Sequence, residues 1–369
     1  MRTVLCDTLG IEHPIVGFTP SEHVAAAISR AGGLGVLGCV RFNDPEELDA
    51  VLDWMDTNCD GKPYGVDIVM PAKVPTEGTQ IDLDSLIPQA HREFVDNTLR
   101  KLGVPPLPDD EASGAGVLGW LHSVARSHVD VAMKHPIALI ANALGSPPAD
   151  VIAQAHRGGV PVAALAGKAE HAVRHVDNGV DLVVAQGYEA GGHTGEIASM
   201  VLIPEIVAAV GDRVPVLAAG GIGSGRQIAA ALALGAVGAW MGSYWLATKE
   251  YQELSSAGTL QQALVRATSS DTVRSRVYTG KPARLLKNQW TQAWAAVDAP
   301  APLPMPLQNL LVSEAHQRMM RAGDPSVLAM PVGQIVGSMN EIRAVADVMT
   351  ELVDDLEAAL TRLDELRGL

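Results

Sequence analysis

The sequence is poor in aromatic residues and in cysteine. Aromatic side chains make up 4% of the 369 residues, and alanine, valine, leucine and glycine supply the bulk of the apolar composition. This profile suits close packing of helices on strands better than it suits an aromatic-rich β-sandwich. The three cysteines, Cys6, Cys39 and Cys59, have no metal-like spacing, and their odd number fits a reducing compartment. We therefore expect a cytoplasmic protein.

Positive charge and long apolar runs are also scarce. The chain has 27 Lys and Arg against 42 Asp and Glu, a formal net charge of −15. This balance argues against general binding to nucleic acids or to anionic membranes. No uninterrupted apolar run is long enough to span a bilayer, and the opening MRTVLCDTLGIEHP does not have the pattern of a signal peptide. We expect a small molecule, rather than a nucleic acid or a membrane, as the partner.

The sequence does contain a regular alternation of short apolar strands and helical segments. The strands before the last recur about every 20 to 30 residues, except across one irregular stretch. Eight such repeats favour a closed (β/α)8 TIM barrel, an α/β fold, over an open doubly wound sheet. The expected strands are His13–Phe18, Leu34–Cys39, Tyr64–Met70, Ile137–Leu144, Val160–Ala166, Asp181–Gly187, Val214–Gly221 and Val237–Leu246.

Two parts of the chain depart from this alternation. Residues 71–135 are rich in polar residues and proline and are too long for an ordinary loop, so we expect a helical insertion that acts as a lid or cap. Residues 251–369 have the pattern of a helical extension packed on a barrel formed by residues 1–250. The long C-terminal helix either covers the barrel or pairs with another subunit in a homodimer.

Capping patterns indicate where some of the helices begin. Thr19, Pro20 and Glu22 have the spacing of a capping box with Thr19 as the N-cap residue. Ser224 and Gln227 have the same spacing before a later helix. We expect a helix to follow each of these patterns.

Glycine-rich turns follow the seventh and eighth strands. The first contains Gly221, Gly223 and Gly225, and the second is Gly242-Ser243. Glycine lets backbone N–H groups approach a ligand, and the N-terminus of a following helix favours a phosphate. The spacing is not GxGxxG and no acidic residue follows about 20 residues later, which argues against a Rossmann NAD site. We expect the phosphate site that TIM barrels place after strands seven and eight.

His193 lies in the segment EAGGHTGE, after the sixth strand and therefore at the expected catalytic face. A neutral imidazole there can act as a general base near pH 7. Glu189 and Glu196 flank it and either orient it and raise its pKa or are simply solvated. A structural role for a lone histidine is the alternative.

Other polar residues give weaker indications. Asp67 lies within an apolar strand, so its charge needs either a ligand donor or a basic side chain as partner. Lys168 follows the fifth strand and is a candidate substrate contact. His171 and His175 have metal-capable spacing but no third ligand, so we expect no metal. The basic segment Lys281–Lys287 is expected to be a solvated patch.

The run VVAQGYEAGGHTGE, the strand PVLAAGGI, the helix GRQIAAALALGA and the following GS turn resemble the nitronate monooxygenases. The segments AAISRAGGLGVLG, YGVDIVMP and TGKPARLLKNQW also match, so the resemblance covers about residues 11–72 and 136–290. The resemblance implies an FMN-binding barrel with His193 as catalytic base. The flavin contacts that it implies are at Phe18, Asp67, Gln186, Gly191, Gly192, Gly221, Gly223, Trp240, Met241, Gly242 and Ser243.

The sequence departs from the family pattern at two of these positions. The position of Asp67 is usually Asn, and a carboxylate there accepts a hydrogen bond from the flavin but opposes the negative charge of a reduced flavin. The first strand of the family usually ends in Ala-Pro-Met, whereas this chain has GFTP, which places Phe18 near the expected flavin face. Both departures bear on the substrate.

The resemblance leaves three functions open. The first is oxidation of nitroalkanes or nitronates with O2 to a carbonyl compound and nitrite, without NAD(P)H. The second is NAD(P)H-dependent reduction of an enone, enoyl thioester or quinone, because flavin enoyl reductases and quinone reductases share the fold and a similar EAGGH loop. The third is flavin binding without catalysis.

Overall fold

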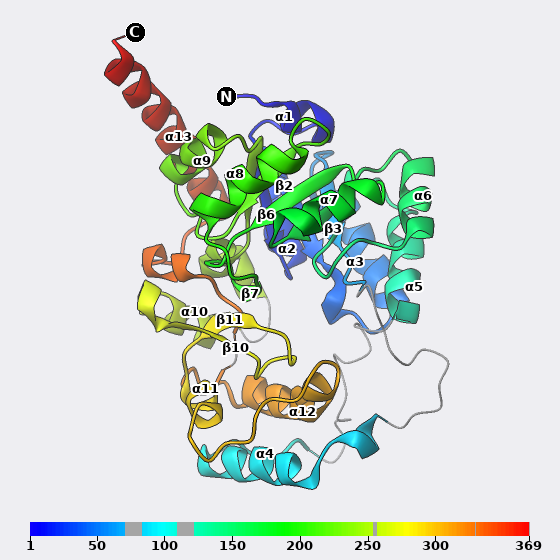
Figure 1. Ribbon diagram of the computed structural model, residues 1–369, viewed down its shortest axis with the longest axis vertical. Helices are drawn as coiled ribbons and strands as arrows, with labels where there is room; N and C mark the ends of the chain where they lie inside the picture. Colours follow the sequence, from blue (N-terminus) through cyan, green and yellow to red (C-terminus); the bar gives the residue numbers. More distant parts are fainter. Residues whose placement is uncertain (71–82, 109–121, 254–256, 329, 369) are drawn as a thin grey trace.

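The computed structural model describes residues 1–70, 83–108, 122–253, 257–328 and 330–368. Its core is a closed barrel of eight parallel strands, which confirms the predicted TIM barrel (Figure 1). The barrel closes where β1 pairs with β9, with Ile15 opposite Ala239. In order around the barrel, the strands are β1 (Ile15–Thr19), β2 (Leu34–Gly38), β3 (Tyr64–Asp67), β4 (Leu139–Asn142), β5 (Val162–Ala166), β6 (Leu182–Gln186), β8 (Val216–Ala219) and β9 (Gly238–Met241).

Helices surround this barrel, and one of them comes from the far end of the chain. The helix α13 contacts both α9 and α2, so it fills the place of the helix that would follow β9 (Figure 1). No helix in the described ranges is long and apolar enough to cross a membrane. The surrounding helices are α2 (Glu22–Arg30), α3 (Pro45–Asn58), α5 (His122–Ala132), α6 (Ala149–Arg157), α7 (Ala169–Asp177), α8 (Ser199–Val210), α9 (Gly225–Ala233) and α13 (Val345–Arg367).

The inside of the barrel is filled by side chains of alternate strand positions, as the pleat of a β-strand requires. Val16, Val184 and Trp240 belong to this interior cluster. Leu5 and Leu9 of the short helix α1 (Val4–Leu9) join it and close the N-terminal end of the barrel. The C-terminal ends of the strands lie at the opposite end of the barrel, where TIM barrels carry their active sites.

A layer at the end of the molecule opposite α1 contains α4 of the insertion and α11 and α12 of the extension, whereas α13 lies beside the barrel (Figure 1). In this layer α4 contacts α12, so this part of the insertion packs on the extension. The other described helix of the insertion, α5, packs on α3 in the barrel wall. Residues 71–82 and 109–121 of the predicted lid lie outside the described residues, and the role of the lid stays a prediction. The helices named here and the remaining helix of the extension are α4 (Gln89–Lys101), α10 (Ala257–Leu264), α11 (Gln289–Trp294) and α12 (Leu307–Ala322).

The extension is not wholly helical, which corrects the prediction. It contains β10 (Thr272–Ser275) and β11 (Ala283–Leu286), which form a three-stranded sheet with β7 (Gly192–His193). We call residues 272–286 the extension hairpin. Its strands are short and β7 has only two residues, so the sheet depends on tertiary pairing and leaves little periodicity in the sequence.

Several predicted boundaries also move. The N-cap residue of α2 is Ser21, whose side chain accepts a hydrogen bond from Val24 N, whereas Thr19 still belongs to β1 and pairs with Leu37. The third strand ends at Asp67 rather than Met70. The last strand ends at Met241, because residues 243–247 form a 3₁₀ helix. The predicted N-cap Ser224 is confirmed, since its side chain accepts from Gln227 N.

The helix α13 should contribute strongly to stability because its first half fills a place in the barrel wall. Leu356 is 2% exposed and lies in the core cluster with residues of α9. We expect Leu356→Ala to lower the free energy of unfolding by about 2–5 kcal/mol, as large-to-small core changes do. Leu366→Ala is the matched control: this leucine lies on the same helix but is 71% exposed, so its loss should cost at most about 0.5 kcal/mol. Urea unfolding measures both, and equal effects would contradict the assigned place of α13.

Candidate active site

His193 is held between the barrel and the extension. It lies in β7, in the loop that follows barrel strand β6, and is paired with Ala283 of the extension hairpin. Its Nε2 atom is 2.7 Å from Oγ1 of Thr279, a fully buried residue of the same hairpin. Backbone pairing and a side-chain hydrogen bond therefore fix this imidazole from a segment that is distant in sequence.

The surroundings of His193 keep its imidazole neutral. Burial, together with the positive charge of Lys281, lowers the pKa of His193 to about 4. The flanking carboxylates do not raise it, contrary to one sequence-based interpretation. Glu189 instead accepts hydrogen bonds from the backbone N–H and hydroxyl of Ser199, and Glu196 forms an ion pair with Arg274. At neutral pH the ring is in the form that can accept a proton.

Arg284 braces the loop that carries His193. It is 2% exposed, so the prediction of a solvated basic patch is wrong at this position. Its Nε and Nη2 atoms donate to the carbonyl of Tyr188 at 3.1 and 2.9 Å, and its guanidinium lies 4.4 Å from the centre of the Tyr188 ring. A third bond, from Nη1 to Thr272 Oγ1, ties the arginine to the extension hairpin itself. The sequence of the basic segment Lys281–Lys287 does not show which of its basic residues is buried.

Asp67 is a buried carboxyl group with an unsatisfied oxygen. It ends β3, is 3% exposed, and has no hydrogen-bond partner for Oδ1 in the described part of the chain. No Lys or Arg of the described ranges forms an ion pair with it, and burial raises its pKa to about 7. The sequence analysis expected either a basic partner or a ligand donor here, and no basic partner is present among the described residues. An orphaned polar atom at the catalytic end of the barrel fits a bound cofactor.

Phe18 and Trp240 come from neighbouring strands at the same end of the barrel. Their rings are nearly parallel, with centroids 6.5 Å apart and an interplanar angle of 19°. Trp240 belongs to the interior cluster and Phe18 packs against it, so both rings are placed inside the barrel near the ends of their strands. The side chain of Met241 instead lies in the core between strands and outer helices, so only its backbone is left to contact a ligand.

The first glycine-rich turn is only partly available to a phosphate. Gly221 has a φ of +71°, a conformation that favours glycine, at the end of β8. The next part is already bonded within the protein: Gly223 N–H donates to Gln227 Oε1 at 2.9 Å, and Arg226 N–H donates to Asp355 of α13 at 2.9 Å. Two N–H groups of this turn and of the α9 N-terminus therefore already have partners within the protein, and the predicted phosphate contacts at Gly221 and Gly223 stay predictions.

The second turn and the loop before His193 are crossed by the segment around Gly333. Its N–H donates to Ser243 Oγ at 2.8 Å, next to Gly242. A Cβ on Gly191 would lie 2.7 Å from Gly333 N, so close packing of the extension accounts for that glycine. Gln186 ends β6 and is half-buried, and Gly192 has a φ of +72°. Their predicted flavin contacts stay predictions.

The remaining sequence candidates are Lys168 and the pair His171 and His175. Lys168 is exposed at the start of α7, and its role as a substrate contact stays a prediction. His175 is structural: Nδ1 bonds Ser146 Oγ at 2.7 Å and Nε2 bonds the carbonyl of Leu165 at 3.1 Å. With both nitrogens engaged, it is not available to bind a metal with His171.

One other group of side chains has a spacing suited to a cation. Asp53, Asp56 and His135 place their ligand atoms within 4.8 Å of one another. Asp56 already accepts from the hydroxyl of Tyr64 at 2.6 Å and bonds His135 Nδ1 at 2.8 Å. These bonds explain the grouping without a metal.

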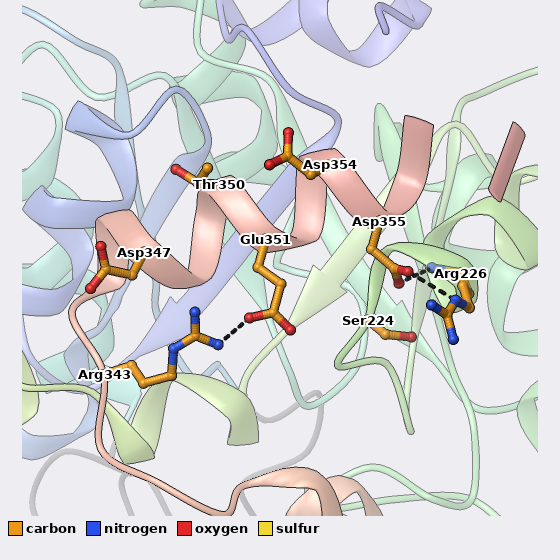
Figure 2. A pocket seen from close by; sticks show the side chains of 8 residues that line it. All are labelled: Ser224, Arg226, Arg343, Asp347, Thr350, Glu351, Asp354 and Asp355. Carbon is orange, nitrogen blue, oxygen red and sulfur yellow. Dashed lines mark hydrogen bonds and ion pairs between the residues drawn. The ribbon is translucent and has the colours of Figure 1, made fainter. Parts of the chain in front are cut away.

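A large open pocket of about 720 Å³ lies on the outside of the barrel wall, between α9 and α13 (Figure 2). Four of the eight residues that line it are acidic, and its two arginines are paired, Arg226 with Asp355 and Arg343 with Glu351. This charge disfavours a phosphate, and neither His193 nor Asp67 lines the pocket. It is not the site that the barrel geometry defines.

A TIM barrel with a buried histidine and an unsatisfied carboxyl group at its C-terminal end has a candidate base and a candidate ligand contact where enzymes of this fold carry their active sites. The sequence model of the family described as nitronate monooxygenase matches residues 2–355. The chain therefore belongs to the nitronate monooxygenase family, which consists of flavin-dependent oxidoreductases.

Individual relatives agree with this placement. The chain is 47% identical to the protein Rv1533 of Mycobacterium tuberculosis, named as a candidate monooxygenase, over 100% of this chain and 99% of that protein. It is 26% identical to a "Probable nitronate monooxygenase" of Staphylococcus aureus, over 89% and 90% of the two chains.

Two solved structures are similar over almost the whole chain. Nitroalkane oxidase from Streptomyces ansochromogenes has a TM-score of 0.81 at 28% identity, covering 98% of this chain and 100% of that one. FabK from Thermotoga maritima has a TM-score of 0.74 at 27% identity, covering 100% and 99%.

The raised pKa of Asp67 gives a stability prediction for the protein without flavin. When the pKa of an acid is higher in the folded state than in the unfolded state, the unfolded state loses its proton first as the pH rises. The free energy of unfolding therefore falls between the pKa of an unfolded Asp, about 4, and the raised pKa of Asp67, about 7. Between about pH 5 and about pH 8, the wild type should lose about 2–3 kcal/mol relative to Asp67→Asn, which cannot ionise. Urea unfolding at both pH values tests this, with the exposed Asp298→Asn as control. Parallel pH dependence of wild type and Asp67→Asn would show that Asp67 does not titrate in this range.

Proposed function

We propose that this protein oxidises alkyl nitronates, and the nitroalkanes from which they form, with O2 to a carbonyl compound and nitrite, using FMN as cofactor. The observation that carries the proposal is the neutral, buried imidazole of His193 at the catalytic end of the barrel. The family to which the chain belongs and its likeness to a nitroalkane oxidase support the same reaction.

The residues at the barrel mouth fit FMN. The unsatisfied Oδ1 of Asp67 offers an acceptor to a ring N–H of the flavin, and the parallel rings of Phe18 and Trp240 offer a flat apolar surface. The backbone at Gly221 and at the turn 242–243 would hold the phosphate, and Gln186, Gly191 and Gly192 would lie along the ring. When bound, FMN supplies the redox chemistry with oxygen.

The role of the protein is to prepare the anionic form of the substrate and to hold it. His193 accepts the α-proton of a neutral nitroalkane, which leaves the nitronate anion. A preformed nitronate needs no such step. The positive charge of Lys281 that lowers the pKa of His193 also stabilises a nearby anion, so the electrostatics favour the nitronate.

A flavin reductase of an enone, enoyl thioester or quinone is the second candidate, because the fold also matches FabK. In that reaction His193 would serve as a proton donor. With a pKa of about 4, only about one imidazole in a thousand carries the extra proton at neutral pH. His193 is therefore almost entirely in the neutral form that a base requires, whereas a proton donor would first have to be protonated.

The variant His193→Asn separates proton removal from the rest of the reaction. Activity on a neutral nitroalkane should fall about 10²–10⁴-fold because the base is lost. Activity on the preformed nitronate should stay within about threefold, because that substrate has already lost its proton. Oxygen uptake and nitrite release, measured without NAD(P)H, follow both substrates.

Equal loss on both substrates would contradict the role of His193 as base. No oxygen uptake by the wild-type flavoprotein with any nitronate would contradict the proposed function as a whole.

A further inference from the structure

Thr279 supplies the hydrogen bond that holds the imidazole of His193 from the side of the extension. Its Oγ1 atom lies 2.7 Å from Nε2, the short end of the range for such a bond, and its side chain is fully buried. The backbone N–H of Lys281 donates to the same oxygen at 3.4 Å. The sequence analysis did not single out this residue, although it opens the segment TGKPARLLKNQW.

The position of Thr279 is itself fixed by the extension. Gly280, the next residue, has a φ of +88°, and its N–H closes the turn onto the carbonyl of Arg276 at 2.8 Å. A Cβ on Gly280 would lie 2.4 Å from the backbone nitrogen of Met305, so the turn is packed tightly against that segment. The buried side chain of Gln308, at the start of α12, bonds the carbonyl of Val277 at 3.1 Å. The hydroxyl of Thr279 is thus presented by a rigid turn.

We propose that Thr279 is a positioning residue that holds the imidazole of His193 in one rotamer, so that the C-terminal extension completes the catalytic group of the barrel. The proposal rests on the proposed role of His193 as base. The bond between Thr279 Oγ1 and Nε2 fixes the direction in which the ring points. It therefore fixes the position of the ring relative to a substrate bound at the barrel mouth.

Three variants separate this role from mere packing. Thr279→Val keeps the shape of the side chain and removes the hydroxyl, and Thr279→Ser restores the hydroxyl. Ser275→Ala is the control: its hydroxyl lies in the same hairpin and accepts from Val277 N–H at 3.4 Å. Each variant is prepared as the full-length flavoprotein, and FMN content and thermal stability are recorded first.

Kinetics on two substrates give the first readout. For Thr279→Val we expect kcat/KM on a neutral nitroalkane to fall about 10- to 100-fold, which is less than the loss expected when the base itself is removed. Activity on the preformed nitronate should stay within about twofold of the wild type, because that substrate has already lost its proton. Thr279→Ser should recover most of the loss, and Ser275→Ala should match the wild type. Equal losses on both substrates, or no rescue by serine, would overturn the proposal.

Nitrogen-15 NMR of the histidine side chains gives a readout that does not depend on turnover, with His193 assigned by its absence in His193→Asn. We expect the Nε2 resonance of His193 at the same position in the wild type and in Thr279→Ser, and at a different position in Thr279→Val, which has lost the hydrogen bond to Nε2. The same Nε2 resonance position in all three would overturn the proposal even if activity changed. A resonance that moves only in Thr279→Val, in a protein that turns over no nitronate, would leave the positioning role intact and contradict the proposed reaction instead.

Discussion

The pairing of the two-residue strand β7 with the extension hairpin is the contact on which the site depends. The barrel places the loop after β6 at its catalytic end, but the three consecutive small residues before and at β7 have no large side chain that could pack against the barrel. Backbone pairing with Ala283 and Arg284, the bonds from Arg284 to Tyr188, and the bond from Thr279 to His193 supply that support. A segment about 90 residues further along the chain thereby makes a glycine-rich loop into a defined catalytic position.

The extension serves the barrel in a second way, on its outer side. The helix α13 fills the wall between α9 and α2, and its Asp355 occupies the N-terminus of α9. The chain therefore closes its barrel with its last helix, and the same extension covers the catalytic end with the hairpin. The sequence analysis divides the chain at about residue 250 into a barrel and an extension. In the structure, residues from both sides of this division surround His193. A homodimer stays a prediction.

The fold could be predicted from the sequence because eight apolar strands alternate with amphipathic helices, a pattern set by local periodicity. The three-stranded sheet could not, because β10 and β11 are short and the third strand, β7, is distant in sequence and has only two residues. His193 could be predicted from its place after the sixth strand. The role of Thr279 could not, since a threonine 86 residues away shows no pattern that links it to a histidine. The sequence also does not reveal that a carboxylate of α13 accepts a hydrogen bond from Arg226 N–H at the α9 terminus.

The claim at the centre of this account is that a flavin at the barrel mouth takes its electrons from a nitronate. Anaerobic titration of the purified protein, followed by its visible spectrum, tests this most directly. The account predicts FMN absorption bands that are lost on addition of propyl-2-nitronate and that persist with NADH or NADPH. Absence of flavin bands, even after FMN is added, would contradict the cofactor assignment. Rapid bleaching by NADH or NADPH, with none by the nitronate, would contradict the reaction and identify a reductase.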